Sequence, residues 1–246
     1  MSIQSSAELE GLKRCGRIVR IALDAMVAAV QPGISTAELD AIGARTLASH
    51  GAEASPPKVY GFPGSLCISV NDEAIHGIPG DRILQSGDLV KLDLVAEMDG
   101  FVTDAAVTVR VGKVSAKADA LVHCVENAFW KGARAARAGN RIYEIGRAVE
   151  REVRASGFSV MKALCGHGVG RTIHEEPAIP NYFDRHSRTK LKEGLVIAIE
   201  PIAATGSGDE RLLRDGWTVS TVDHGLSAHF EHTLVITKSE PILITV

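Results

Sequence analysis

The segment Gly87-Asp88-Leu89-Val90-Lys91-Leu92-Asp93 joins a glycine to a carboxylate across an apolar, strand-like run. The pattern returns in Gly194-Leu195-Val196-Ile197-Ala198-Ile199-Glu200, where a glycine again stands six residues before the carboxylate. Likewise, Thr103-Asp104-Ala105-Ala106-Val107-Thr108-Val109 parallels Phe230-Glu231-His232-Thr233-Leu234-Val235-Ile236. A carboxylate on an apolar strand is costly unless it is paired, hydrogen-bonded or bound to a cation. Each half of the chain therefore predicts two strands that carry such a carboxylate.

Four predicted helices follow the same repeated order. Helical spacing and cap signals place them at residues 7–30 and 35–50 in the first half, and at 116–137 and 142–157 in the second. Two of them begin with a possible capping box: Ser5-Ser6-Ala7-Glu8 and Ser35-Thr36-Ala37-Glu38. The matching offsets favour a duplicated α+β unit with a pseudo-two-fold axis and a site between its halves. Chance similarity among common helix–turn–strand patterns is the alternative.

A hairpin and an insertion set the spacing of the carboxylates. Asp93 and Asp104 flank Met98-Asp99-Gly100, and Asp-Gly between two apolar runs is a strong hairpin signal. The hairpin can bring both carboxylates to neighbouring positions, although a capping and a surface aspartate would explain the pair equally well. The second pair of carboxylates is further apart, and we expect residues 203–226 between them to form an exposed, charged excursion with short strands near Trp217.

At 246 residues the chain could form one or two domains. No linker-like or low-complexity stretch divides it, which favours a single domain over residues 1–246, with halves at about 7–112 and 113–246. A net charge of −3 provides no global basic field that would recruit DNA. The first residues lack the features of a signal peptide, and no apolar stretch approaches the length of a membrane span. Four widely spaced cysteines argue against a zinc ribbon or a disulfide scaffold. We expect a cytoplasmic monomer.

Three histidines stand in turn-like segments close to these strands. His167 lies in the glycine-rich segment 165–171, and His174 follows seven residues later. His76 precedes Gly77-Ile78-Pro79-Gly80, which fixes a turn beside its imidazole. Two histidines in a glycine-rich segment between carboxylate-bearing strands favour a functional role. For His76, spacing alone leaves the functional and structural interpretations equal.

The predicted strands and turns supply four carboxylates and one imidazole that could bind metal: Asp93, Asp104, Glu200, Glu231 and His167. This mostly hard ligand set suits manganese, iron, cobalt or magnesium at least as well as zinc. Two divalent ions about 3.5–4 Å apart can lower the pKa of a shared water and stabilise a tetrahedral intermediate. The residues therefore predict metal-assisted hydrolysis. The alternative needs a separate structural role for each ionisable group.

Taken together and in order, five segments of the chain resemble type I methionine aminopeptidase of peptidase family M24, in its short bacterial form. The segments are Asn71–Pro79, Leu89–Thr108, Gly166–Pro177, Ile199-Glu200-Pro201 and Phe230-Glu231-His232-Thr233. The similarity runs from about residue 7 to the C-terminus, and the combined pattern is highly specific. It implies the "pita-bread" α+β fold, a duplicated unit with a central antiparallel sheet and a dinuclear metal site.

The resemblance also implies a role for each residue of the site. It implies a site for two divalent ions (cobalt, manganese, iron(II) or zinc). The ligands implied for these ions are Asp93, Asp104, His167, Glu200 and Glu231. Asp104 and Glu231 would bridge the ions, and Glu200 would accept a proton from the attacking water. His76 would contact the scissile amide and His174 the substrate carbonyl, so both would stabilise charge that develops in the transition state.

The activity implied is removal of the initiator methionine from nascent polypeptide N-termini when the second residue is small. The candidates for an apolar methionine pocket are Tyr60, Phe62, Cys67 and Trp217, each of which could instead be plain core. A transient ribosome contact could use Arg211, Arg214, Lys190 and Lys192, although a solvated charged loop also explains these residues.

Three positions depart from the pattern that is common in bacterial members. Val59 and Ile173 stand where many members carry an aromatic residue, and Ala228-His229-Phe230 replaces the more usual Ala-Gln-Tyr. These departures leave the five ligands in place. They put the second-residue preference in doubt but not the reaction.

Two other functions compete with this interpretation. Prolidase and aminopeptidase P share the implied fold and metal set but usually carry a large N-terminal domain, whereas here the catalytic-type unit begins near residue 7. A non-enzymatic binding protein could also retain the fold. Such relatives tend to lose metal ligands, and all five are present in this sequence.

Overall fold

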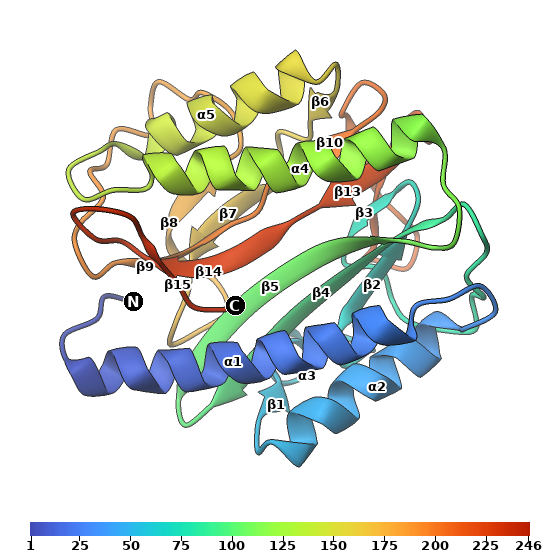
Figure 1. Ribbon diagram of the computed structural model, residues 1–246, viewed down its shortest axis with the longest axis horizontal. Helices are drawn as coiled ribbons and strands as arrows, with labels where there is room; N and C mark the ends of the chain where they lie inside the picture. Colours follow the sequence, from blue (N-terminus) through green and yellow to red (C-terminus); the bar gives the residue numbers. More distant parts are fainter.

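The computed structural model describes all 246 residues and contains five helices. Their bounds are α1 Ser6–Ala29, α2 Thr36–Ser49, α3 Ser55–Tyr60, α4 Ala116–Ala135 and α5 Ile142–Ala155. The four predicted helices correspond to α1, α2, α4 and α5 within about two residues. Figure 1 shows the α1–α2 pair and the α4–α5 pair on opposite sides of the long strands β4, β5 and β14. None of these helices combines the length and the apolar character that crossing a bilayer requires.

The main sheet has nine strands, and every pairing in it is antiparallel. Its path is β1 (Glu53–Ala54), β4 (Leu89–Met98), β5 (Phe101–Arg110), β14 (Glu231–Val235), β9 (Val196–Ile199), β7 (Cys165–Gly168) and β8 (Glu175–Pro180), with β2 (Cys67–Val70) on β4 and β15 (Ile242–Leu243) on β14. The two halves of the chain meet where β5 pairs with β14.

Two three-stranded sheets complete the structure. One is formed by β13 (Ser227–His229), β10 (Ile202–Ala204) and β6 (Ser159–Val160). The other is formed by β11 (Glu210–Leu212), β12 (Val219–Thr221) and β3 (Glu73–Ile75). The predicted excursion at 203–226 therefore does contain short strands, and β12 ties it to the segment just before His76.

Local sequence signals explain most of the element boundaries. Asp99 and Gly100 both have positive φ, 53° and 75°, as a two-residue hairpin turn between β4 and β5 requires. Ser35 and Glu38 form the complete capping box predicted at the start of α2. Only half of the capping box predicted at the start of α1 forms. The backbone N–H of Glu8 donates to Ser5 Oγ, but the carboxylate of Glu8 accepts from the backbone of Gln4 and not from that of Ser5.

Each helix pair is buried against its own part of the sheet. One apolar cluster joins α4 and α5 to β9 and β14, and a second joins α1 and α2 to β2 and β4. Phe129 of α4 and Leu23 of α1 are fully buried in these clusters. Each such side chain contributes roughly 1.5–3 kcal/mol by leaving water. The helices therefore stabilise the strands that carry the carboxylates, and the division into one domain over residues 1–246 stays a prediction.

Candidate active site

The register of the sheet aligns the carboxylates. Asp93 on β4 pairs with Ala106 on β5, and Ala106 pairs in turn with Glu231 on β14. Paired residues point to the same face of a sheet, as do residues two apart on one strand, so Asp104 shares that face with Ala106. The methyl side chain of Ala106 leaves room between the carboxylates. The predicted meeting of Asp93 and Asp104 across the hairpin is therefore confirmed, at a diagonal position.

Glu200 and His167 come from the second half of the chain. Glu200 directly follows Ile199, which pairs with His232, so its side chain enters the site beside Glu231. His167 lies on β7, and its Nδ1–H donates a hydrogen bond to the carbonyl oxygen of Gly168 at 2.9 Å. A metal-binding imidazole commonly uses its second nitrogen in this way. The flanking Gly166 is required there, because a Cβ would lie 2.3 Å from the carbonyl oxygen of Ala198.

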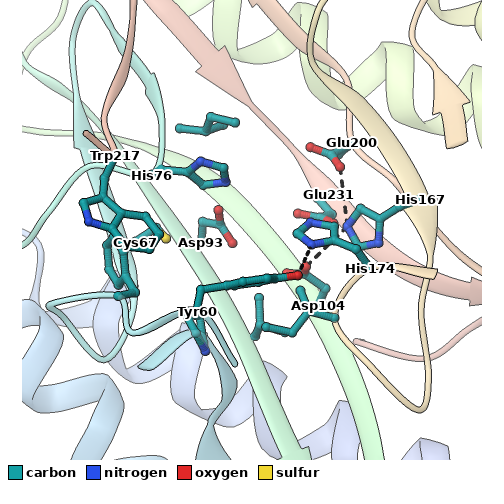
Figure 2. Close-up of a pocket in the computed structure, with 15 residues that line it drawn as sticks. Tyr60, Cys67, His76, Asp93, Asp104, His167, His174, Glu200, Trp217 and Glu231 are labelled. Carbon is teal, nitrogen blue, oxygen red and sulfur yellow. Dashed lines mark hydrogen bonds and ion pairs between the residues drawn. The ribbon is translucent and has the colours of Figure 1, made fainter. Parts of the chain in front are cut away.

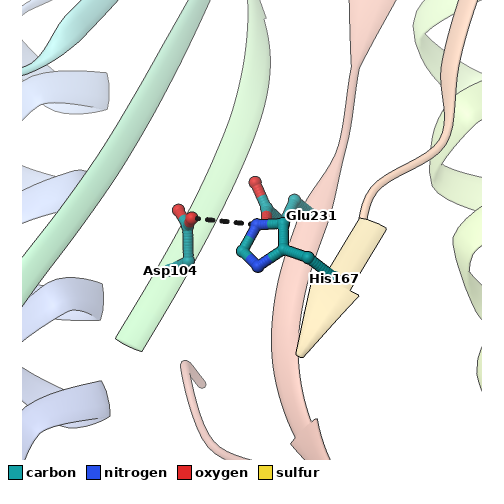
Figure 3. Close-up of side chains that lie close together, drawn as sticks. All are labelled: Asp104, His167 and Glu231. Carbon is teal, nitrogen blue, oxygen red and sulfur yellow. Dashed lines mark ion pairs between the residues drawn. The ribbon is translucent and has the colours of Figure 1, made fainter. Parts of the chain in front are cut away.

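The side chains converge at distances that suit a shared cation. His167 Nε2 lies 3.7 Å from Asp104 Oδ2 and 3.6 Å from Glu200 Oε1. Ligand atoms of Asp104, His167 and Glu231 lie within 4.8 Å of one another. Figure 3 shows these three side chains close together, each on a different strand. Asp93 lines the same cavity, so all five predicted ligands surround one space.

The electrostatics of the cluster are unfavourable without a cation. Burial raises the pKa of Glu200 well above its ordinary value, and the nearby charges of Glu231 and Asp104 raise it further. Burial also raises the pKa of Asp104 well above normal, and Glu231 adds to that shift. The pKa values of Glu231 and Asp93 rise mainly through burial. Like charges held together out of water are costly, and a bound cation removes that cost.

Two buried oxygens, Asp104 Oδ1 and Glu231 Oε1, have no hydrogen-bond partner in the protein. Native proteins rarely leave buried polar atoms unpaired, and coordination of a metal ion commonly satisfies oxygens of this kind. Carboxylate oxygens with one or more imidazoles are also suitable donors for Mn²⁺, Fe²⁺, Co²⁺ and Zn²⁺. The residues present therefore fit divalent metal ions.

Both additional histidines lie beside the carboxylates (Figure 2). His76 has a positive φ of 56°, a conformation that side-chain-bearing residues seldom adopt and that functional sites often contain. Its ring lines the same cavity as His174. The rings of His174 and His167 pack edge to face with their centroids 4.4 Å apart. Tyr60 Oη lies 2.6 Å from His174 Nδ1. Burial lowers the pKa of both His76 and His174.

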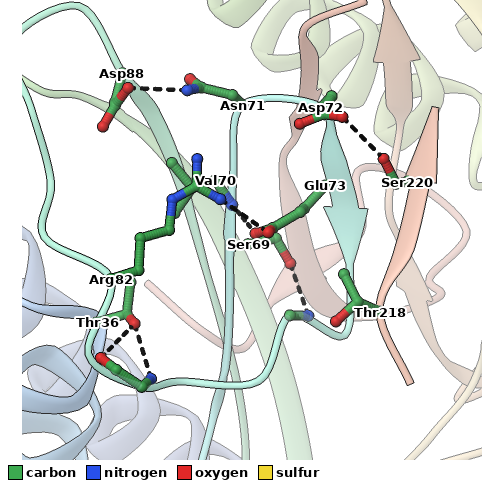
Figure 4. A network of polar contacts seen from close by, with 12 residues as sticks. Thr36, Ser69, Val70, Asn71, Asp72, Glu73, Arg82, Asp88, Thr218 and Ser220 are labelled. Atoms are coloured by element: carbon green, nitrogen blue, oxygen red, sulfur yellow. Dashed lines mark hydrogen bonds and ion pairs between the residues drawn. The ribbon is translucent and has the colours of Figure 1, made fainter. Parts of the chain in front are cut away.

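A polar network holds the loop that carries His76 (Figure 4). The amide of Asn71 donates to Asp88, and the carboxylate of Glu73 accepts from the guanidinium of Arg82 and from the backbone of Val70. The backbone N–H of Gly77 donates to Ser69 Oγ. Since these bonds anchor the loop on both sides of residue 76, the imidazole has a defined position over the site.

All four predicted pocket residues line one cavity of about 310 Å³. Phe62 and Trp217 pack edge to face with ring centroids 5.3 Å apart, and Cys67 lies beneath them opposite Asp93 on the neighbouring strand. Tyr60 forms part of the wall near His174. The cavity therefore has an apolar end and a carboxylate-lined end. Val59 is exposed, whereas Ile173 lines the cavity.

Two buried basic residues near the carboxylates were missed by sequence reasoning. His229 is 1% exposed, and its Nε2 lies 3.3 Å from Glu231 Oε2. Lys91 is also 1% exposed, and burial lowers its pKa to about 7. Period-two spacing could have placed Lys91 on the same face of β4 as Asp93, but His229 lies on β13 and not on β14, the strand of Glu231. Burial likewise lowers the pKa of His229 to about 4.

Comparison with known proteins gives consistent matches. The model of metallopeptidase family M24 matches residues 10–238. Methionine aminopeptidase 2 of Bacillus subtilis (strain 168) is 47% identical, over all of this chain and 99% of its own length. The crystal structure of methionine aminopeptidase from Rickettsia prowazekii superposes with a TM-score of 0.96 at 34% identity, covering all of both chains.

Prolidase from Pyrococcus furiosus is a more distant structural match. Its TM-score is 0.80 at 25% identity, and the match covers 99% of this chain but 65% of the prolidase. The shared architecture confirms the predicted α+β fold with a central antiparallel sheet.

Proposed function

The chain belongs to metallopeptidase family M24, and on that premise we propose that it hydrolytically removes an N-terminal methionine from polypeptides whose second residue is small. Family membership implies use of divalent metal. The observation that carries the proposal is the convergence of five metal-ligand side chains beside a partly apolar cavity of about 310 Å³. That volume lies at the small end of the range for ligand pockets, and it includes both the apolar end and the carboxylate-lined end.

The metal centre that we propose holds two divalent ions. Its ligands would be Asp93, Asp104, His167, Glu200 and Glu231, of which Asp104 and Glu231 would serve both ions. When bound, the ions supply Lewis-acid activation of a water and of the scissile carbonyl. Cobalt, manganese, iron(II) and zinc remain the candidates for their identity.

Protein groups around the ions accept the proton of the water and stabilise the charge that develops on the substrate. Glu200 lines both the cavity and the adjoining groove, so its carboxylate can accept the proton of the attacking water. His76 lines both the cavity and the adjoining groove, which places it for contact with the scissile amide. His174 likewise lines both, and its free Nε2 can donate a hydrogen bond to the substrate carbonyl as negative charge develops there.

Substrate selection follows from the shape of the cavity. Phe62, Cys67 and Trp217 form the apolar end and Tyr60 the wall beside His174, so an unbranched apolar first side chain fits there. A second groove, which shares His76, His174 and Glu200 with the cavity, gives the rest of the peptide a path away from the site. Cleavage after the first residue is the consequence.

The partner that we propose is the N-terminus of a nascent polypeptide. Cytoplasmic location, a monomeric state and transient contact with the ribosome through residues such as Arg211 and Lys190 stay predictions from the sequence.

The test compares two peptides, Met-Ala-Ser and Ala-Pro, as substrates of the metal-loaded protein. We expect hydrolysis of Met-Ala-Ser and release of free methionine. Hydrolysis of Ala-Pro alone would assign the chain to X-Pro peptidases, which share its fold. Inertness toward both peptides with every candidate metal would contradict an enzymatic role and favour a binding protein.

A further inference from the structure

His229 lies beside two carboxylates of the metal cluster and is almost completely buried, with 1% of its surface exposed. Its Nε2 lies 3.3 Å from Glu231 Oε2 and 3.7 Å from Glu200 Oε2. The carboxylate of Glu200 thus faces two imidazoles, because its other oxygen lies 3.6 Å from His167 Nε2. Ligand atoms of Glu200, His229 and Glu231 all lie within 4.8 Å of one another.

The imidazole of His229 has no hydrogen-bond partner in the protein at either ring nitrogen. The nearest carboxylate oxygen is within reach, yet the orientation of the ring forms no hydrogen bond with it. A buried nitrogen that is left unpaired destabilises the folded protein. Two carboxylates beside Nε2 make a cation the suitable partner for its lone pair.

The spacing of these atoms suits one ion bound between them. Metal–ligand bonds of about 2.1 Å to two atoms 3.3–3.7 Å apart open an angle of about 100–125° at the metal. That range is normal for tetrahedral and five-coordinate divalent ions. The pairs formed by His167 Nε2 with Asp104 and Glu200, at 3.7 and 3.6 Å, give the same range. His229 and His167 therefore meet the same geometric criterion.

The backbone around His229 is fixed in place. Its N–H donates to Thr108 Oγ1, and Thr108 Oγ1 donates to its carbonyl oxygen, both at 2.8 Å. Lys91, which pairs with Thr108 across the sheet, donates to the carbonyl oxygens of Asn71 and Ser227. These bonds hold β13 against β5, so the imidazole is preorganised toward the carboxylates.

We propose that His229 is a sixth protein ligand of the metal centre and binds through Nε2 the ion that Glu231 and Glu200 also contact. The inference rests on the proposed metal site and adds a second imidazole to a set dominated by oxygen. Imidazole favours zinc and cobalt over manganese more strongly than carboxylate does. The second imidazole therefore raises the affinity for zinc relative to manganese.

The direct test counts coordinated imidazoles by NMR. The full-length protein is labelled with ¹⁵N-histidine, stripped of metal and titrated with ¹¹³Cd²⁺, which shows scalar coupling to each coordinated nitrogen. We expect two coupled imidazoles, one of which disappears in His229→Gln. His232→Gln is the matched control, because His232 is an equally buried imidazole that bonds to Thr245. It should retain both couplings.

The outcomes separate this inference from the metal site itself. One coupled imidazole in the unmodified protein, assigned to His167, would overturn the role of His229 and leave the five-ligand site intact. No coupled imidazole would overturn both. Circular dichroism checks that each variant is folded.

Metal affinity provides a second, independent readout. Competition with a chromogenic chelator gives the affinities for Zn²⁺ and Mn²⁺ without any assay of activity. We expect His229→Gln to weaken Zn²⁺ binding about tenfold or more, with a smaller effect on Mn²⁺. An unchanged ratio of the zinc and manganese affinities would contradict the proposal.

Discussion

Tyr60 Oη lies 2.6 Å from Nδ1 of His174, although the two residues are 114 positions apart in the sequence. When the phenol donates this bond, Nδ1 is the acceptor and the proton of the neutral imidazole sits on Nε2. That tautomer can donate a hydrogen bond to the substrate carbonyl. A residue predicted to line the methionine pocket therefore also orients a residue predicted to act on the carbonyl.

Removing this hydroxyl should slow the reaction. We expect Tyr60→Phe to lower kcat by about tenfold, because the loss of one neutral hydrogen bond is worth roughly 0.5–1.5 kcal/mol. Its KM for Met-Ala-Ser should change little, since the ring remains in the wall. Tyr143→Phe is the control, because the hydroxyl of Tyr143 makes no hydrogen bond to another side chain. Equal kinetics in all three proteins would remove the orienting role.

Replacing His174 itself should act on the same step more strongly. His174→Ala loses a donor that is matched to charge in the transition state, and such losses reduce kcat by about 100- to 1,000-fold. Steady-state kinetics with Met-Ala-Ser separates kcat from KM. A raised KM with an unchanged kcat would assign the residue to substrate binding instead.

The carboxylates should be essential for turnover but not for folding. We expect Glu200→Ala and Asp104→Ala to abolish release of methionine with little loss of thermal stability, because each substitution relieves repulsion in the metal-free cluster. Glu193→Ala, at an exposed site that pairs only with Lys238, should retain full activity. Substantial turnover in either cluster variant with excess metal present would contradict the assignment.

The metal-free protein should become less stable as pH rises. The pKa of Glu200 in the folded state is raised above its unfolded value, first by burial and then by Glu231 and Asp104. Below the unfolded pKa both states are protonated. Above it the unfolded state releases a proton that the folded state retains, so the free energy of unfolding falls until the folded pKa is passed.

Urea unfolding in chelator between about pH 5 and pH 8 measures this dependence. Glu200→Gln should show a shallower fall than the unmodified protein, because the amide cannot titrate and one charge is absent from the cluster. Saturating metal should remove most of the difference in pH dependence between Glu200→Gln and the unmodified protein. An identical pH dependence in the two metal-free proteins would show that Glu200 is not held at a raised pKa.

The sequence predicted the architecture because its signals are local and repeated. Asp99-Gly100 specified the hairpin, Ser35 and Glu38 specified the start of α2, and strand period placed each carboxylate on one face. Local signals of this kind do not predict contacts between residues that are far apart in the sequence. The bond between Tyr60 and His174 joins a short helix to a glycine-rich loop, and neither segment indicates the other.

The missed residues show the same limit more clearly. His229 precedes Glu231 by two positions, but it lies on β13, which pairs with β10 and not with β9. Lys91 lies in the interior, where the carbonyl oxygens of Asn71 and Ser227 accept hydrogen bonds from its ammonium group. The placement of His229 and the burial of Lys91 both depend on how separate sheets pack, which strand period does not encode.

The central claim is tested most directly by release of methionine from Met-Ala-Ser and Met-Lys-Ser. Chelator-treated protein is assayed before and after titration with manganese, cobalt, iron(II) or zinc. We predict no release without metal, and metal-dependent release from Met-Ala-Ser but not from Met-Lys-Ser, whose second residue is too large. Release that persists in chelator, or no release from Met-Ala-Ser with any of the four metals, would contradict the proposed function.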